Sequence, residues 1–475
     1  MACSVTMFKR AGAGAVVLGA GPAGLACSYE LSRRDVPTTV VERSKGVGGL
    51  CRTFNYNGFL FDIGGHRFLS RSREVNAIWE DVLGEDLLRC SRKSSIYYQG
   101  HFYRYPLNAF DTLKNLGLIE SARCFFSYLN SQVMPPVDQT NFEGWMTRRF
   151  GRRLFEIFFK PYTEKVWGIS CAELSGDWAS QRIQQLSLRK AIKSAIFGNG
   201  NGKIKSLSDE FLYPKLGPGQ FCDRLKTKSE SLGTQYRMQA EVDQINVAGK
   251  RVDSVEIRNA AGRSEKLCGD SFISSIPLPV LIERIRPRAP LGVLSAARSL
   301  KFRSFISVNL IFNEPRLFDE NWIYIQSPDI TAGRVQNYKN WSSAMVPDAE
   351  KTSLGVEYFV SEGDSVWSLS DEQMMALALE ELERIRIVGR AKVAGGFVVR
   401  VANAYPVYDS GYQRSLHIIR AYLETIENLQ AMGRAGLFRY NNSDHAVLTG
   451  LCAARNILGE KHDLWAIDPD QGRDE

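Results

Sequence analysis

The sequence predicts an α/β protein with a parallel sheet near its N-terminus, and three observations in the first 42 residues support this. Residues 15–20 (AVVLGA) are a short apolar run of the kind that forms a buried strand, and Leu25–Arg34 then has the character of a helix. Between them lies the segment 19–24, Gly-Ala-Gly-Pro-Ala-Gly, a complete G-x-G-x-x-G. A second apolar run, Pro37–Val41, ends in Glu42 and predicts the neighbouring parallel strand.

The glycines of this segment have the spacing of a dinucleotide-binding turn. Gly19 permits the tight turn, Gly21 lets a pyrophosphate approach the backbone, and Gly24 lets the helix pack on the strand. The helix N-terminus offers unpaired N–H groups and the positive end of its dipole to phosphates. Glu42 follows Gly24 by 18 residues, where a carboxylate accepts hydrogen bonds from a ribose diol. Together these features predict a Rossmann-type domain, whereas a lone glycine motif would indicate only a turn.

The composition is that of an ordinary globular protein, at 44% hydrophobic and 24% charged residues. A chain of 475 residues is too long for one compact core, so we expect two or three substructures. The net charge of +8 suits an anionic ligand, or it reflects solvated helix faces. Nucleic-acid binding is disfavoured, because the basic cluster at residues 148–153 is short and lies in an amphipathic helix pattern.

Nine cysteines are scattered singly, which argues against a disulfide framework and against a zinc site, and we expect no metal. Reduced thiols fit a cytoplasmic protein. Lys9 and Arg10, followed by the uncharged residues 11–28, imitate a signal peptide or a membrane span. That run is rich in Gly and Ala and contains the glycine motif, so we expect no membrane span.

Two further glycine pairs indicate which dinucleotide is bound. Arg43 is followed by Gly48-Gly49-Leu50, and residues 61–66 read Phe-Asp-Ile-Gly-Gly-His. These segments resemble the family that includes amine oxidases, protoporphyrinogen oxidases, phytoene desaturases and UDP-galactopyranose mutases, which implies FAD in a glutathione-reductase-like domain. The returning strand at 240–247 and the pair Gly433-Arg434 resemble segments that complete this domain. The motif and the resemblance assign these residues to FAD: Gly19, Gly21, Pro22, Ala23, Gly24, Glu42, Arg43, Gly49, Leu50, Gly64, Gly65, His66, Val242, Gly433, Arg434 and Asn442.

The FAD-binding segments are expected to be discontinuous, at 1–106, 205–290 and 390–460. Residues 107–204 have helical periodicity and form an insertion that lines the substrate pocket. Residues 291–389 contain strand patterns and are expected to form a mixed or antiparallel substrate sheet, followed by a helix at 371–384 with Ser370 as its N-cap. The polar tail at 461–475 is expected to fray. The expected strands of the substrate sheet are 305–312, 322–326, 334–338 and 355–360.

The insertion resembles the mutase branch of this family. Residues 159–168 (FKPYTEKVWG) and 178–183 (WASQRI) are similar to the mutase segment that lines the nucleotide-sugar pocket. The resemblance implies that Trp167 lies beside flavin and substrate, that Arg182 binds the diphosphate, and that His66 approaches the flavin N5 edge; these three are the candidate catalytic residues. A core tryptophan, a surface arginine and a histidine bonded to backbone are the plainer alternatives. The candidate substrate-binding residues are Tyr105, Asn108, Thr163, Trp167, Arg182, Arg334, Tyr405 and Tyr440.

The chain also departs from the mutases. They have a second diphosphate-binding arginine after a strand like 304–312, and Asn313 is the residue that aligns with it. Arg334 is one candidate for the missing charge, and a cross-strand ion pair is the alternative role for it. Leu107 and Asn108 stand where a mutase often has an aromatic ring and a glutamine near the base.

The leading hypothesis is a nucleotide-sugar pyranose–furanose mutase or a close relative. The resemblance implies that reduced flavin N5 attacks the anomeric carbon and expels a nucleoside diphosphate before the ring recloses, so an external electron donor must reduce the flavin. The main alternative is an FAD-dependent oxidoreductase of the amine oxidase, porphyrinogen oxidase or desaturase type. A non-enzymatic FAD-binding protein is a third. The sugar, the nucleotide and the oligomeric state stay open.

Overall fold

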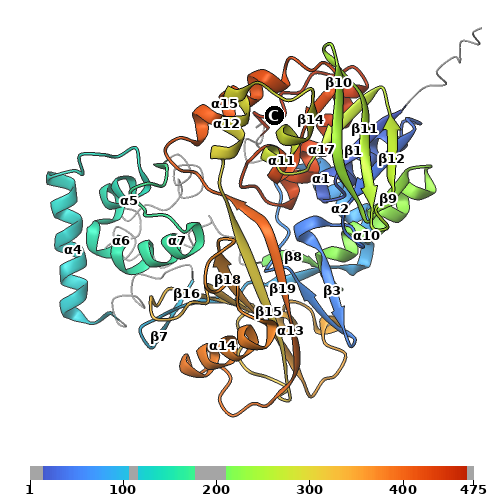
Figure 1. Cartoon of the computed structure of the whole chain (residues 1–475). Coiled ribbons are helices and arrows are strands. Elements are labelled where there is room, and N and C mark those ends of the chain that lie inside the picture. The colour runs from blue at the N-terminus through green and yellow to red at the C-terminus, as the bar shows by residue number, and fades with distance from the viewer. Residues whose placement is uncertain (1–13, 106–115, 177–209, 468–475) are drawn as a thin grey trace, which may run out of the picture.

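A parallel sheet, a second sheet of seven strands and a group of helices at one side make up the part of the chain that the computed structural model describes, residues 14–105, 116–176 and 210–467 (Figure 1). The predicted α/β fold class is confirmed. Within these residues no helix combines the length and the apolar character that crossing a membrane requires.

The parallel sheet has five strands in the order β20-β13-β1-β2-β9. Strand β1 (Ala15–Leu18) is central and fully buried, because helices cover both faces of a parallel sheet. Helix α1 (Pro22–Ser32) follows it, and every residue of α1 after Pro22 is buried. The other strands are β2 (Thr38–Glu42), β9 (Gln235–Met238), β13 (Ser271–Ser274) and β20 (Leu429–Ala431), and the neighbouring helices are α10 (Pro218–Ser231) and α17 (Ser443–Ile457).

Helices α1 and α17 pack with almost no space between their backbones. A side-chain carbon at Gly450 of α17 would lie 2.2 Å from the carbonyl oxygen of Ala23 on α1. Gly433, the first residue of α16 (Gly433–Gly436), is similarly close, because its added carbon would lie 2.9 Å from the Ala23 methyl group. These contacts bring the C-terminal segment, more than 400 residues away in sequence, onto the first helix.

A four-stranded sheet of order β12-β11-β10-β14 flanks the parallel one. Its central pair, β10 and β11, is an antiparallel hairpin whose register shifts twice. The bounds here are β10 (Ala240–Ala248), β11 (Arg251–Asn259), β12 (Ser264–Cys268) and β14 (Ile285–Arg286), with helices α11 (Leu278–Arg284), α12 (Leu291–Ser299) and α15 (Tyr412–Leu423) beside them.

The seven-stranded sheet has the order β19-β15-β18-β17-β16-β6-β7 and is antiparallel except at β16–β6. Strand β18 (Thr352–Val360) is buried along its whole length, and helix α14 (Asp371–Arg384) packs on the sheet. Ser370 caps α14 and forms a capping box with Gln373, as the sequence predicts. The other strands are β15 (Phe302–Phe312), β16 (Trp322–Ile325), β17 (Arg334–Asn337), β19 (Val393–Pro406), β6 (Ser94–Tyr98) and β7 (His101–Arg104).

Some strands of this sheet come from outside the segment 291–389 that was expected to form it. Strands β6, β7 and β19 belong to it, although the sequence places them with the FAD-binding segments. Strand β19 runs antiparallel along nearly all of β15, and β6 pairs with β16 in parallel. The alternation of side chains shows that a segment is a strand, but it does not show which sheet receives it.

The helices at the side of the molecule come from the segment between β7 and β8. Helix α7 is the innermost, and α4 stands at the outer edge (Figure 1). Their bounds are α4 (Leu118–Val133), α5 (Phe142–Phe150), α6 (Arg152–Phe158) and α7 (Lys160–Trp167). The remaining elements are η1 (Gly49–Cys51), β3 (Thr53–Tyr56), β4 (Phe59–Asp62), α2 (Arg73–Leu83), η2 (Gly84–Asp86), β5 (Leu87–Ser91), β8 (Glu210–Pro214), α13 (Tyr338–Trp341), η3 (Ser343–Met345) and α16 (Gly433–Gly436).

We expect Gly450→Ala to destabilise the protein by about 1–3 kcal/mol, because the new methyl group meets the backbone of α1, which cannot move aside. Urea unfolding followed by circular dichroism measures this. Gly292→Ala on α12 is the matched control, since a side chain there meets open space. It should be neutral or stabilising by up to about 1 kcal/mol. Equal effects of both variants would contradict the tight contact.

Candidate functional site

The turn between β1 and α1 has the geometry expected of a pyrophosphate-binding loop. Gly19 has φ +100°, and a side chain at Gly24 would lie 1.9 Å from the Gly19 carbonyl oxygen. A side chain at Gly21 would instead meet no protein atom within 4 Å. Helix α1 begins with Pro22, no side chain caps its N-terminus, and no acidic residue lies in its first turn. Its free N–H groups therefore suit a phosphate.

The second glycine pair folds against the first. The Gly48 N–H donates to the Ala20 carbonyl oxygen at 2.7 Å. An added carbon at Gly49 would lie 3.4 Å from the Gly21 Cα atom. Leu50, in η1, follows directly. The two segments that the sequence assigns to FAD thus lie side by side.

Glu42, at the end of β2, is buried and held in place by backbone donors. One carboxylate oxygen accepts from the Ala20 N–H and the other from the Ser44 N–H, each at 2.9 Å. The carboxylate is thereby fixed beside the glycine loop. Arg43 is exposed. Val242 is buried on β10, a strand that contacts β2.

The loop Gly64-Gly65-His66 follows β4 and meets the seven-stranded sheet. The Gly65 N–H donates to Glu357 Oε1 at 3.3 Å. The His66 Nδ1 lies 3.1 Å from the Gly64 carbonyl oxygen, which can only accept, so Nδ1 carries the proton in this bond. In the neutral ring Nε2 then has a free lone pair.

Arg434 comes from the opposite end of the chain and lies over two tyrosine rings. Its guanidinium is 4.7 Å from the centre of the Tyr405 ring and 4.3 Å from that of Tyr440. It donates to the carbonyl oxygens of Ala404 and Asn441. Its Nη2 atom is buried without a hydrogen-bond partner. A buried unsatisfied cationic N–H is costly, which fits a site whose anionic or polar ligand completes it.

These residues fit FAD on this chain's own geometry. The space beside Gly21, the uncapped start of α1 and the positioned Glu42 match the pyrophosphate and ribose. Asn442 begins α17 and its side chain makes no capping bond, so a second helix N-terminus is available near Arg434. The unpaired Arg434 N–H supplies a further donor.

An arginine–tyrosine cluster, defined as Arg334, Arg434, Tyr162, Tyr324, Tyr405 and Tyr440, lies next to the Gly64–His66 loop. The rings of Tyr405 and Tyr440 stack with centres 5.7 Å apart. Tyr162 and Tyr324 meet edge to face at 5.5 Å. Arg334 interacts electrostatically with members of both tyrosine pairs, namely Tyr162, Tyr324 and Tyr405.

Arg334 forms the cross-strand ion pair that was one of its two expected roles. It is directly opposite Glu357 in the β17–β18 register. Its Nε and Nη2 donate to the same carboxylate oxygen, at 2.7 and 2.5 Å. Its Nη2 also lies 3.6 Å from the position of a side chain at Gly64. The ion pair therefore holds Arg334 so that it faces the loop. Pairing with Glu357 is thus compatible with the other expected role, which is to supply positive charge to the site.

Asn313 does not lie where the missing arginine would be needed. The end of β15 that reaches the loop is the one with Phe305, whose ring is 3.5 Å from the Gly64 side-chain position. Eight residues of strand, roughly 26 Å, separate Phe305 from Asn313. Asn313 therefore lies far from the Gly64–His66 loop, and its alignment with the mutase arginine stays a prediction, since strand patterns do not fix the end of a strand at which a site lies.

Burial and charge set the protonation of the cluster. Burial raises the pKa of Tyr405 and of Tyr162, so both keep their protons and can donate. Burial likewise raises the pKa of Tyr105 to about 12. Burial, and then the charges of Arg434 and Arg334, lower the pKa of His66 to about 4. His66 is therefore neutral at physiological pH.

Helix α7 supplies the other side of the site. Trp167 is fully buried, with its ring stacked on Tyr408 and edge to face with Tyr440 at 5.6 Å. Thr163 is buried on the same helix, and its neighbour Tyr162 is the residue in the cluster. Tyr105, after β7, contacts Tyr324 edge to face at 5.3 Å.

Lys165 fixes α7 against the connection between β16 and β17. Its ammonium donates to the carbonyl oxygens of Ile325, Ser327, Ile330 and Ala332 at 2.8–3.3 Å. From the other side the Glu381 carboxylate accepts the N–H groups of this connection. Burial lowers the pKa of Lys165 to about 8. Lys165 thereby sets the distance between Tyr162 on α7 and the strands with Tyr324 and Arg334.

Sequence reasoning missed Tyr162, Tyr324, Gln336 and Glu357. The sequence did contain one signal for part of this set. Arg334 and Gln336 lie on the same face of one strand, and Glu357 is an acidic residue within a buried strand. Arg182 and Asn108 lie outside the described residues.

We expect Gly21→Val to abolish FAD retention while the chain still folds. The backbone there has φ −72°, which valine adopts, and the new side chain meets only the space for the pyrophosphate. Flavin absorbance per protein after gel filtration measures the loss. Gly46→Val, on the exposed loop after β2, also points into open space and should keep FAD. A folded Gly21→Val protein with full flavin content would refute the assignment.

We expect the stability of the protein to fall as pH falls from about 6.5 to about 4, partly through His66. Its folded pKa lies below its unfolded value, so in this window the unfolded chain takes up a proton that the folded chain does not. Because His66 is only half-buried, we expect about 1 kcal/mol from it between pH 6.5 and 5. His66→Gln should remove that share in urea unfolding, whereas a His417→Gln control at an exposed position should not. Identical pH dependence in wild type and His66→Gln would overturn this.

Known proteins similar to this chain include oxidases and a mutase. Coproporphyrinogen III oxidase of Bacillus subtilis is 23% identical over 439 residues, 86% of this chain and 90% of that enzyme. The same-named enzyme of Staphylococcus aureus is 22% identical over 259 residues, 50% of this chain, so the match spans about half (55%) of that relative. A solved structure of reduced UDP-galactopyranose mutase is similar over 97% of this chain and 98% of its own, with a TM-score of 0.83 at 21% identity. The last likeness shows a shared fold.

The family described as flavin containing amine oxidoreductase matches residues 22–458. This span includes α1, the seven-stranded sheet, the parallel sheet apart from β1, and α17. The chain therefore belongs to the flavin-containing amine oxidoreductase family, and it is a flavoenzyme that holds FAD.

Proposed function

We propose that the protein is a mutase-like flavoenzyme that binds a nucleoside-diphosphate sugar and interconverts its pyranose and furanose forms. The observation that carries this proposal is the arginine–tyrosine cluster beside the Gly64–His66 loop. The carboxylate that touches the cluster, that of Glu357, already accepts hydrogen bonds from Arg334, Gln336 and the Gly65 N–H. The cluster thus presents positive charge and hydroxyl donors, which suit an anion.

The charge balance of the site supports an anionic substrate. The Arg434 guanidinium has a buried N–H without a hydrogen-bond partner, and His66 adds no positive charge at neutral pH. An amine substrate would bring a cation toward two arginines, which is unfavourable at short range. A diphosphate brings negative charge to the same place.

Each residue has a defined task in this reaction. Bound FAD in its reduced form supplies the nucleophilic N5 atom that this reaction class uses. Tyr405 and Tyr440 donate from their hydroxyls to the diphosphate, and Arg334 stabilises the negative charge that grows as it leaves. Trp167 holds Tyr440 by ring contact. His66 offers its Nε2 lone pair as an acceptor near the reacting groups.

Arg182 is proposed as an additional diphosphate anchor. Tyr105, Thr163 and Asn108 are proposed to contact the nucleoside.

The alternative is an FAD-dependent oxidase or desaturase acting on an organic substrate. The observation that favours it is that relatives such as the two coproporphyrinogen III oxidases are named as oxidases. In that case the same cluster would hold acidic groups of the substrate, and oxidised FAD would be the reagent.

We expect the dithionite-reduced, FAD-loaded protein to interconvert a nucleoside-diphosphate sugar over many turnovers without oxygen, and the oxidised protein to be inactive. A mutase needs the reduced flavin and consumes no acceptor. Chromatography of the products from a panel of nucleotide sugars measures this. Oxygen uptake equal to product formed, together with no activity under reduction, would assign the protein to the oxidases.

Tyr405→Phe tests whether the cluster binds the anion. The ring contacts with Tyr440 and Arg434 stay, but one donor is lost, so kcat/KM should fall about 10-fold or more with unchanged FAD content. Tyr422→Phe on α15 is the matched control and should be silent. Unchanged kcat/KM in Tyr405→Phe would place the diphosphate elsewhere.

A further inference from the structure

Helix α4 is oriented with its polar face inward. Toward α5 and α6 it presents small and polar side chains. The Gln132 side chain donates to the Arg148 carbonyl oxygen, and the Arg148 guanidinium donates to the carbonyl oxygens of Ser131 and Gln132. The approach is close, since a side chain at Gly151 would lie 2.6 Å from the Tyr128 backbone nitrogen. The partly or fully buried residues of α4 are Glu120, Ser121, Cys124, Ser127, Tyr128, Ser131 and Gln132.

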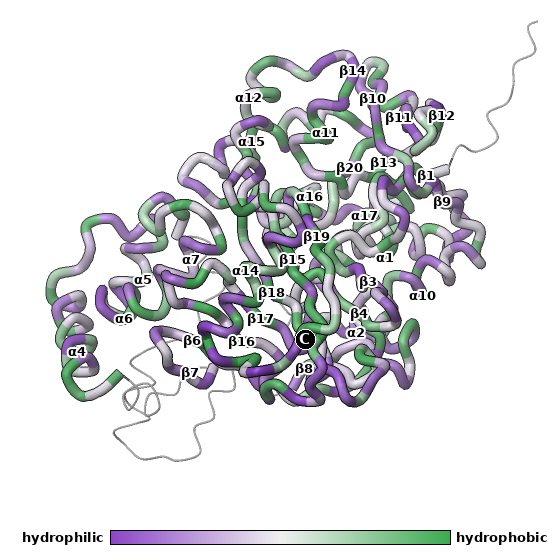
Figure 2. Tube along the Cα trace, turned by 60° about the horizontal axis from the view of Figure 1, so that its bottom comes forward, coloured by the Kyte–Doolittle hydropathy of each residue, from purple (hydrophilic) through white to green (hydrophobic). Residues whose placement is uncertain are grey.

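The opposite face of α4 is apolar and exposed. Leu118 is 90% exposed, Phe126 66% and Val133 79%. At 3.6 residues per turn the apolar residues of the helix fall within an arc of roughly 120°. Helix α4 itself stands at the outer edge of the molecule in both views (Figures 1 and 2). The exposed apolar surface, here called the α4 stripe, consists of Leu118, Ile119, Phe125, Phe126, Leu129, Val133, Met134 and Val137.

The size of the α4 stripe is that of a stable interface. Its exposed fractions correspond to an apolar area on the order of 1,000 Å², whereas the largest apolar patch of a monomer is about 300–600 Å². A standard protein–protein interface buries about 800 Å² on each partner. The stripe therefore suffices for one such interface, and leaving it in water would be costly.

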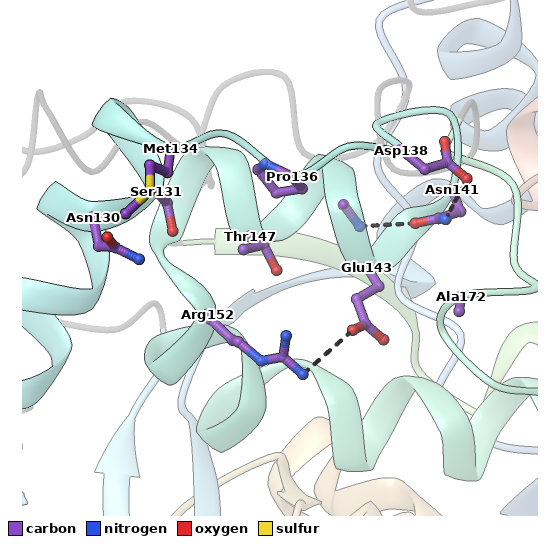
Figure 3. A pocket seen from close by; sticks show the side chains of 11 residues that line it. Asn130, Ser131, Met134, Pro136, Asp138, Asn141, Glu143, Thr147, Arg152 and Ala172 are labelled. Atoms are coloured by element: carbon purple, nitrogen blue, oxygen red, sulfur yellow. Dashed lines mark hydrogen bonds and ion pairs between the residues drawn. The ribbon is translucent and has the colours of Figure 1, made fainter.

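The border of the α4 stripe is polar. At the end of the helix a cavity of about 290 Å³ is lined by Met134 and Pro136 together with mostly polar residues, among them Asn130, Asp138 and Glu143. Figure 3 shows Arg152 facing Glu143 across it, at 4.0 Å. An apolar centre with a polar rim is the usual anatomy of an interface between proteins.

We propose that the α4 stripe binds the α4 stripe of a second copy of this chain, forming a symmetric dimer. An antiparallel pairing places the two-fold axis near Phe125 and Phe126, so Leu118 of one copy lies against Val133 of the other. A lipid surface is disfavoured by charge. The nearby arginines Arg123 and Arg153 pair with Glu120, and Arg153 also pairs with Glu156, so two positive and two negative charges cancel and leave little to attract an anionic membrane.

The test is light scattering during gel filtration of the full-length FAD-loaded protein, together with sedimentation of the dimer at several concentrations. Wild type should be a dimer at micromolar concentration. Phe126→Glu combined with Val133→Glu should raise the dimer dissociation constant at least 100-fold, while FAD content and the circular dichroism spectrum stay unchanged because both side chains are mostly exposed. Leu291→Glu on α12 is the matched control, since Leu291 is also exposed (84%) but lies outside the stripe, and it should leave the dimer intact.

Each other outcome overturns the proposal. A monomeric wild type would do so, whether it stays free or sediments with phosphatidylglycerol vesicles; in the second case the stripe is a lipid-binding surface. A dimer that survives Phe126→Glu/Val133→Glu uses another surface. None of these outcomes depends on which reaction the flavin site performs.

Discussion

The buried carboxylate of Glu357 joins the two halves of the site. It is fully buried and binds Arg334, Gln336 and the Gly65 N–H, so it connects the seven-stranded sheet to the loop of the FAD-binding half. A buried ion pair contributes little net stability when intact, but removing one partner typically costs about 3–5 kcal/mol. In this site the bonds of Glu357 fix the geometry. They hold Arg334 in place on the sheet, and they hold the loop with His66 against it.

The charge of the site follows from this arrangement. Glu357 is shared among several donors and cannot serve a cationic ligand as well, and burial beside two arginines keeps His66 neutral. Donors that can bind an anionic ligand here include the Arg434 N–H and the protonated Tyr405. The same fold accommodates oxidases and a mutase, so the fold alone does not choose the chemistry. The residues that face the flavin loop favour an anion, and this is why the mutase-like reaction is the better supported proposal.

Local chemistry in the sequence predicts local structure well and long-range placement poorly. The turn at Gly19–Gly24, the strand ending in Glu42 and the cap at Ser370 each depend on a few neighbouring residues, and each can be located from the sequence. Membership of β19 in the distant sheet and the place of Tyr162 depend on which segments meet in space. The distance of Asn313 from the loop shows the same limit, because a strand pattern does not say which end of the strand lies at the site.

The helical region shows how one segment can serve two surfaces. Its inner helix, α7, is fixed by Lys165, whose ammonium satisfies four carbonyl oxygens of the β16–β17 connection. Its outer helix, α4, instead bonds inward through serines and a glutamine and leaves its large apolar residues in water. A helix that only had to cover the site would bury those residues, since burial is where an apolar side chain stabilises a fold. Their outward orientation therefore reflects a second requirement, association, which the active site does not impose.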